Sequence, residues 1–188
     1  IVWNMGLIAA SGRPEAAELF RKVMLASASI PVAFPPVFFD VEAGGGRYDE
    51  MHVDGSVGTR VFYTAGAFSF GQAGGGPGGQ EDLFIIHNGQ LQPVASPTRR
   101  SLRSIAMRVF DSSGKAAVVG DLFRIYAITS REQTGYHWTT IPEGVELVGD
   151  EVFDPVKMRA LYDLGVRGAL AGPVWSTKPP GVTAANPP

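Results

Sequence analysis

The sequence contains no cysteine among its 188 residues, which excludes disulfide bonds, thiol catalysis and cysteine-ligated metal sites. It also has no run approaching the roughly 18 apolar residues that a membrane-spanning helix needs. Neither sign of charge is in large excess: the formal net charge is −2, which argues against a nucleic-acid-binding surface. What the chain does have is a hydrophobic content of 45%, enough to build a core.

The chain begins neither with methionine nor with a signal-like segment. Its first ten residues, Ile1 to Ala10, are apolar apart from Asn4, which predicts a core strand and its exit. We therefore expect the chain to begin in the middle of a domain. That domain is expected to cover residues 1–175, and residues 176–188 are expected to be a Pro-rich tail with little to bury.

Helix-like and strand-like patterns follow one another along the chain, which predicts an α/β fold. The apolar run 82–87, closed by Asn88-Gly89, is typical of a buried strand in such a sheet. Asp154 precedes a proline and is expected to cap a helix rather than to act in catalysis. Helices are expected after Ser11–Glu15, from Ser96-Pro97, over 115–131 and from Asp154-Pro155, and strands over 37–39, 61–63, 82–87 and 136–141.

The most informative stretch runs from Leu25 to Val57. It passes through the small residues Ala26–Ser29 and a short apolar strand, turns at a glycine run, and returns to deliver Asp54. An acid at the end of a short strand, followed by glycine, is a common way to present a catalytic carboxylate. We expect Asp54 to be the catalytic residue, with Gly55 and Ser56 forming a supporting turn in which glycine adopts unusual backbone angles.

This stretch resembles the patatin-like phospholipase family, bacterial type. The resemblance rests on Ala-Ser-Ala-Ser-Ile-Pro at 26–31, Phe34-Pro35-Pro36 and Val53-Asp54-Gly55, and it continues in type and order to Trp175. It implies a three-layer α/β/α fold with a mostly parallel central sheet, of which this chain holds only the C-terminal part.

In the resembling family, the aspartate of an Asp-Gly-Gly or Asp-Gly-Ala motif works with a serine nucleophile as a two-residue dyad. The resemblance therefore implies a phospholipase A or esterase type of lipid acyl hydrolase, in which Asp54 supplies the acid and Ser56 takes the third motif position. It implies a lipid or ester substrate and no cofactor or metal. No Gly-x-Ser-x-Gly occurs in the 188 residues. The nucleophile is therefore expected in an N-terminal part of the same fold, on a missing segment or a separate chain.

Two other functions remain open. Asp54 could orient His87 or His137 in a Ser-His-Asp hydrolase, because serine, aspartate and histidine follow in that order in α/β-hydrolases. Alternatively, the chain is a non-catalytic scaffold or interaction fragment. Ser27 and Ser29 are interpreted as small residues that let helix and sheet approach, since no base is visible beside them.

The glycine run Gly74–Gly79 is interpreted as a surface linker. It follows the aspartate instead of preceding a nucleophile, and no Lys-Ser/Thr pair follows it, as a phosphate-binding loop would need. Phe68 and Phe70, just before it, are expected to pack in the ordinary way, and a peripheral membrane contact is the alternative.

Overall fold

The structure is a computed structural model, and it describes residues 1–63, 81–93, 95, 97–145, 154–172 and 175–182. The chain divides into two compact units, each of which we describe by itself. Unit 1 comprises residues 1–60 and 96–114, and unit 2 comprises residues 61–95 and 115–188. The expectations for Phe68, Phe70, Gly74–Gly79 and Ser96 concern positions outside the described residues.

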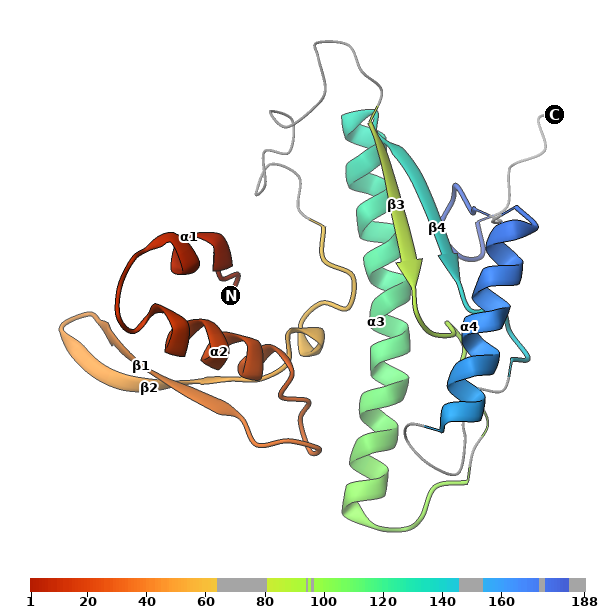
Figure 1. The fold of residues 1–188 in the computed structure, drawn as a ribbon. Helices are drawn as coiled ribbons and strands as arrows, with labels where there is room; N and C mark the ends of the chain where they lie inside the picture. Colours follow the sequence, from red (N-terminus) through yellow and green to blue (C-terminus); the bar gives the residue numbers. More distant parts are fainter. Residues whose placement is uncertain (64–80, 94, 96, 146–153, 173–174, 183–188) are drawn as a thin grey trace. The chain divides into compact units, whose positions relative to one another are not determined.

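The first 60 residues of unit 1 contain the helices α1 and α2 and a β-hairpin (Figure 1). The helices are α1 (Met5–Ala10) and α2 (Ala16–Ser27), and the strands are β1 (Val37–Ala43) and β2 (Gly46–His52). The strands pair antiparallel from Val37↔His52 to Ala43↔Gly46. Gly44 and Gly45 connect them at φ 59° and 80°, the left-handed backbone that a tight two-residue hairpin turn requires.

The core of unit 1 joins α2 to the hairpin. Val23 and Ala26 of α2 are buried with Phe39 of β1, and the Trp3 ring lies 5.2 Å from the Phe39 ring. These contacts hold the end of α2 against the hairpin. The segments that follow α2 and β2 therefore begin at positions held together by the core of unit 1.

The expectation of a strand over Ile1–Ala10 was wrong, because α1 begins at Met5. The Asn4 side chain accepts a hydrogen bond from the Leu7 N–H at 2.9 Å and so caps this helix. A short apolar run cannot be assigned to strand or helix from periodicity alone. Asn4, a polar break in a strand pattern, is the N-cap of a helix.

Unit 2 contains a strand–helix–strand unit and a further helix. Its elements are β3 (Asp82–His87), α3 (Leu102–Glu132), β4 (Gly135–Thr140) and α4 (Pro155–Leu170); the first residues of α3, up to Gly114, belong to unit 1. The strands pair parallel from Asp82↔Gly135 to His87↔Thr140, which confirms both as strands. One face of this pair packs on α3, and the buried side chains are Ile85, Val118, Leu122, Ile125, Tyr136 and Trp138.

Two helices were expected where the structure has the single helix α3. Ser101 marks its start, because its side-chain oxygen accepts a hydrogen bond from the Ser104 N–H at 3.3 Å. Gly114 does not break the helix, although glycine is unfavourable there by about 1 kcal/mol relative to alanine. The Arg60 guanidinium occupies the space that a side chain at Gly114 would fill. A side chain at this position would displace the guanidinium.

Val61–Tyr63 was expected to be a strand and forms none. Side chains of α3 bind its backbone groups instead. The Val61 N–H donates to Asp121 Oδ2 at 2.9 Å, and the Arg124 guanidinium donates to the Val61 and Tyr63 carbonyls at 3.2 and 3.0 Å. Because side chains of α3 form hydrogen bonds with these backbone groups, the groups do not need a neighbouring strand as a partner.

The end of the described chain is attached to β4. Ser176 and Trp138 exchange two backbone hydrogen bonds of 3.0 and 2.9 Å, and the Trp138 indole N–H donates to the Lys178 carbonyl at 2.8 Å. Pro179 is buried. A buried indole needs an acceptor for its N–H. The Pro-rich segment supplies one, a role that its composition did not indicate.

The last helix, α4, begins at the expected capping residue. Asp154 Oδ1 accepts the Val156 and Lys157 N–H groups at 2.9 and 3.2 Å, which confirms it as the cap of α4. Across the part of the chain that the structure describes, no helix combines the length and apolar character needed to cross a membrane.

Replacing Val32 by glycine is expected to stabilise unit 1. Val32 has φ 70°, a left-handed conformation that costs a non-glycine residue roughly 1–2 kcal/mol. Glycine removes that strain but adds chain entropy to the unfolded state, so the free energy of unfolding should rise by about 0.5–1 kcal/mol. Urea unfolding measures the change. The control is Val41→Gly in β1, which should lower stability; a loss of stability in both variants would contradict the strain.

Candidate functional site

Asp54 lies where β2 ends, in a turn fixed by two hydrogen bonds. Its backbone N–H donates to the Ser29 carbonyl at 3.0 Å, just after α2. Its Oδ1 accepts the Ser56 N–H at 2.8 Å and so caps the short 3₁₀ helix Gly55–Val57. Asp54, Gly55 and Ser56 therefore lie in one turn, with the carboxylate half-buried.

The steric reason expected for Gly55 was wrong. Gly55 does not adopt a left-handed φ, and a Cβ placed on it would meet nothing within 4 Å. The sharp turn is stabilised by the Asp54 cap instead. Asparagine, another strong capping residue, could hold the same turn.

Ser29, whose carbonyl binds the Asp54 N–H, has a structural role. Ser29 is 2% exposed, and its hydroxyl donates to the Leu25 carbonyl at 2.8 Å, one turn back in the chain. A hydroxyl bound in this way continues the helix bonding of α2. This agrees with the interpretation of Ser29 as a packing residue, whereas Ser27 is exposed; the link to Asp54 runs through the Ser29 backbone.

His52 and Glu50 form a pair that sequence reasoning missed. His52 Nε2 lies 3.0 Å from Glu50 Oε2, and the His52 side chain is only 11% exposed. Its ring packs edge-on against Phe39, 4.7 Å between centroids. The spacing Glu-x-His could have predicted this pair, because residues i and i+2 of a strand lie on the same face of the sheet. The pair attaches the end of β2 to the core, two residues before Asp54.

The two histidines of the alternative triad lie in unit 2: His87 is the last residue of β3, and His137 lies within β4 as the register partner of Phe84. His137 Nε2 lies 3.0 Å from Asp82 Oδ1, and its ring stacks on Phe84 at 4.7 Å. Within unit 2, the partner of His137 is thus Asp82. His87 ends β3 at the carboxyl edge, where ligands bind in parallel α/β sheets, and its ring lies against Gly89.

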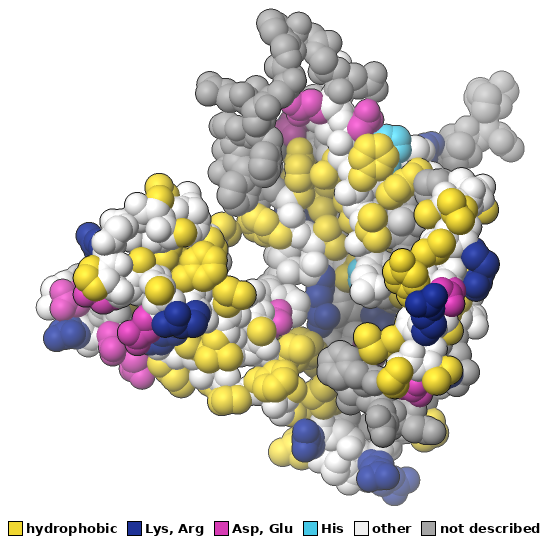
Figure 2. Space-filling view, in the orientation of Figure 1, with side chains coloured by type: hydrophobic (Ala, Val, Ile, Leu, Met, Phe, Trp, Pro, Cys, Tyr) yellow, Lys and Arg dark blue, Asp and Glu magenta, His cyan; other side chains and the backbone are white. Residues whose placement is uncertain are grey.

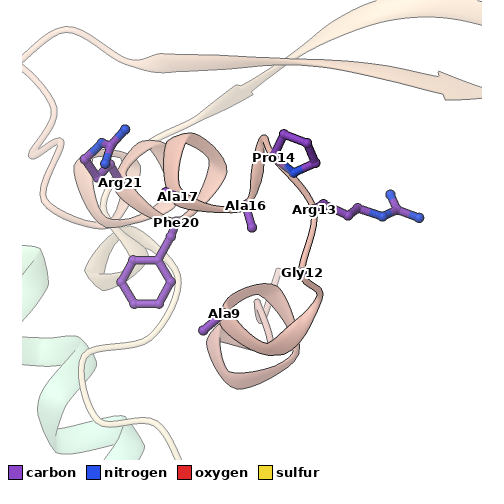
Figure 3. Close-up of a pocket in the computed structure, with 8 residues that line it drawn as sticks. All are labelled: Ala9, Gly12, Arg13, Pro14, Ala16, Ala17, Phe20 and Arg21. Carbon is purple, nitrogen blue, oxygen red and sulfur yellow. The ribbon is translucent and has the colours of Figure 1, made fainter.

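A shallow hollow of about 420 Å³ lies between α1 and α2. Figure 3 shows Ala9 and Phe20 pointing between the two helices, while the Arg13 and Arg21 side chains point away from one another. None of the predicted site residues lines it. Among the described residues, no group of three or more His, Asp or Glu side chains is placed to hold a metal ion.

Burial raises the pKa of Tyr136 to about 12, and the neighbouring Tyr126 adds a smaller effect. The Tyr136 hydroxyl donates to the Leu122 carbonyl at 3.1 Å, beneath the parallel pair. The phenol is therefore held neutral inside unit 2, where it ties β4 to α3. Its contacts give it a structural role.

The stability of unit 2 should fall as the pH rises from 10 towards about 12. In that window the unfolded tyrosine ionises while the folded one stays protonated, so deprotonation favours unfolding; below pH 10 both are neutral. Tyr136→Phe should remove this pH-dependent loss from the free energy of unfolding. Below pH 10 the variant should be less stable than the unmodified protein by about 1 kcal/mol, because it lacks the hydrogen bond to the Leu122 carbonyl. Urea unfolding across the window measures both. Tyr48→Phe, at an exposed tyrosine, is the control. If the free energy of unfolding fell equally with pH in the two variants and the unmodified protein, the raised pKa would not belong to Tyr136.

Comparisons with protein-family models, curated proteins and solved structures found no match for this chain. What the structure establishes is a mixed α/β protein with one parallel and one antiparallel strand pair among its described residues. The resemblance to patatin-like phospholipases rests on the sequence motifs around Asp54.

Proposed function

We propose that this chain is the acid-bearing portion of a patatin-like lipid acyl hydrolase, in which Asp54 and a serine outside the 188 residues form a catalytic dyad. The observation that carries the proposal is the fixed position of Asp54. Its backbone is bound to Ser29 and one carboxylate oxygen is bound to Ser56. This geometry presents an acid at the end of a strand in a defined orientation.

The second carboxylate oxygen is suited to meet a serine. Within the described residues, Asp54 Oδ2 accepts no hydrogen bond, so it can receive the serine O–H. The serine oxygen then attacks the ester carbonyl, and its proton passes to Asp54. When the tetrahedral intermediate collapses, that proton goes to the leaving alcohol. Water repeats the sequence on the acyl-enzyme and releases the carboxylic acid. The amides that stabilise the oxyanion belong to the part of the fold outside this chain.

The architecture of unit 2 supports the proposed three-layer fold. Parallel strands are normally covered on both faces. The face of β3 opposite α3 carries Phe84 and Ile86, which are 55% and 75% exposed. A second layer of helices would cover them. Such a layer, together with additional parallel strands, is what the patatin-like fold adds.

A serine-reactive phosphonate tests the function. The complete protein should label on one serine, within a Gly-x-Ser-x-Gly sequence outside residues 1–188, because only an activated serine reacts rapidly. The present chain alone should remain unlabelled. Mass spectrometry of the labelled peptide identifies the site. A complete protein with no labelled serine would be a non-catalytic scaffold.

The Ser-His-Asp alternative is favoured by one observation, the place of His87 at the carboxyl edge of the sheet. Replacing both His87 and His137 by glutamine in the complete protein separates the two mechanisms. The dyad predicts ester hydrolysis within a few-fold of the unmodified protein. Loss of hydrolysis in the double variant and in His87→Gln alone would establish the triad. His137→Gln is the matched single control because His137 is already paired with Asp82.

A further inference from the structure

The backbone that follows Asp54 is hydrogen-bonded as far as Thr59. The Gly58 and Thr59 N–H groups both donate to the Gly55 carbonyl at 3.1 Å. At its start the turn is held by the hydrogen bond between the Asp54 N–H and the Ser29 carbonyl. A single helical turn is marginal in water by itself, because fixing its backbone costs more entropy than its few hydrogen bonds offset. A turn that keeps its shape therefore needs support at its other end as well.

Arg60, the next residue, provides that support. Its guanidinium lies over the Phe110 ring of α3, 4.7 Å from the ring centroid, and its Nη2 donates to the Phe110 carbonyl at 3.5 Å. The Arg60 Nε atom is buried. Arg60, Phe110 and the Asp54 turn all belong to unit 1. The contact therefore ties the end of the turn to the first part of α3.

Gly114 completes this contact, and we call the three residues Arg60, Phe110 and Gly114 the Arg60 anchor. The guanidinium occupies the space that a Cβ at Gly114 would fill, so the contact depends on both residues. Glycine inside a helix costs about 1 kcal/mol relative to alanine, and burying part of a guanidinium is also unfavourable unless its contacts offset the loss of water. The anchor thus exists at a local cost to the helix, and such costs are expected at functional sites.

We propose that Arg60 is a positioning residue for Asp54. By holding the end of the turn against α3, it fixes the direction in which the carboxylate points. Because Asp54 Oδ1 is bound to the Ser56 N–H, a movement of the turn moves the carboxylate with it. The inference deepens the proposed function and rests on it for its purpose, since a general base must stay within hydrogen-bond reach of the hydroxyl that it serves. The ordering of the turn by Arg60 requires neither the serine nor hydrolysis.

Amide hydrogen exchange of the 188-residue chain, followed by NMR, tests the anchor. In Arg60→Met the Ser56 amide, which is bound to Asp54 Oδ1, should exchange about tenfold faster or more, because local opening of the turn becomes easier. The amides that pair β1 with β2 should keep their protection. Arg47→Met is the matched control and should leave the Ser56 amide unchanged. Arg47 pairs with Glu42 near the turn end of the hairpin, where Figure 2 shows basic and acidic side chains exposed together.

Gly114→Ala removes the contact without weakening the helix. Alanine favours a helix interior over glycine by about 1 kcal/mol, but its Cβ at position 114 would displace the Arg60 guanidinium. The Ser56 amide should therefore exchange faster, as in Arg60→Met. Gly120→Ala is the matched control on the same helix, because a Cβ there would meet nothing within 4 Å. Combining Arg60→Met with Gly114→Ala should accelerate exchange no further than either change alone, because both remove one contact.

Kinetics of the complete protein tests the positioning. Arg60→Met should lower kcat for ester hydrolysis about tenfold and leave KM unchanged, because a misplaced base slows the chemical step without altering lipid binding. Arg60→Lys should recover only part of kcat, since lysine keeps the charge but lacks the planar group that stacks on Phe110. An unchanged kcat in Arg60→Met, or a rise in KM alone, would overturn the positioning role.

The remaining outcomes separate a local effect from a general one. Unchanged Ser56 exchange in both Arg60→Met and Gly114→Ala would overturn the anchor. Equal acceleration in Gly120→Ala, or in all amides of the hairpin, would also overturn it, because stability would then have fallen generally. Circular dichroism must show each variant folded, and Gly114→Ala decides if Arg60→Met unfolds. Faster Ser56 exchange in variants of a complete protein that hydrolyses no ester would refute the proposed function and leave the anchor in place, so the two failures are distinguishable.

Discussion

Replacing Asp54 by asparagine is expected to reduce ester hydrolysis by the complete protein about 10³-fold, within the range that a positioned general base contributes. Asparagine has nearly the shape of aspartate, but its amide cannot accept the serine proton. The loss should appear in kcat with little change in KM, because Asp54 acts on the nucleophile and not on the bound lipid. Steady-state kinetics with a chromogenic ester measures both constants.

The structure indicates that this variant folds. Asparagine caps a helical turn as well as aspartate does, so the bond to the Ser56 N–H persists. The matched control is Asp49→Asn, an exposed acid on β2 of the same hairpin. Asp49→Asn should hydrolyse ester normally and unfold at the same urea concentration. Hydrolysis by Asp54→Asn at the unmodified rate would remove Asp54 from the mechanism.

Leu122→Ala is expected to lower the free energy of unfolding of unit 2 by about 2–5 kcal/mol. Leu122 is 0% exposed, in the centre of the cluster between α3 and the parallel pair. Truncation loses the transfer free energy of its side chain and leaves a cavity that the long helix cannot collapse. A loss of this size is a large fraction of the total stability of a small domain, about 5–15 kcal/mol.

The adjacent Phe123 supplies the control. It is 43% exposed on the same helix, so Phe123→Ala removes a larger side chain at a smaller cost. Urea unfolding followed by Trp138 fluorescence measures both variants, because Trp138 belongs to the same cluster as Leu122. If Phe123→Ala destabilised unit 2 more than Leu122→Ala, the assignment of the α3 face that packs on the sheet would be wrong.

Elements with strong local signals could be predicted from the sequence. The apolar run of β3, the alternation of β4 and the Asp-Pro start of α4 all specify their structure within a few residues. Segments determined by tertiary contacts could not. Val61–Tyr63 has strand composition, but side chains of α3 bind its backbone, and those partners lie about 60 residues away in the chain.

The candidate site likewise combines residues with local sequence signals and residues whose positions depend on tertiary contacts. The Asp54 turn could be located because strand, acid and glycine follow one another in the sequence. The His52–Glu50 pair was missed because histidine at a strand end has many ordinary explanations, and its burial depends on Trp3 and Phe39 from other segments. In the proposed mechanism the serine lies outside these residues, so that half of the site could not be predicted from them.

The hydrogen bond between the Asp54 N–H and the Ser29 carbonyl closes a loop that contains the whole hairpin. Gly44 and Gly45, at the far end of that loop, have nothing within 4 Å of where a Cβ would stand. Because the entropy of closing a loop grows slowly with its length, this tip can accept inserted residues while the base remains closed. The hairpin thus offers a place where evolution, or an experimenter adding an epitope, can lengthen the chain without disturbing the carboxylate.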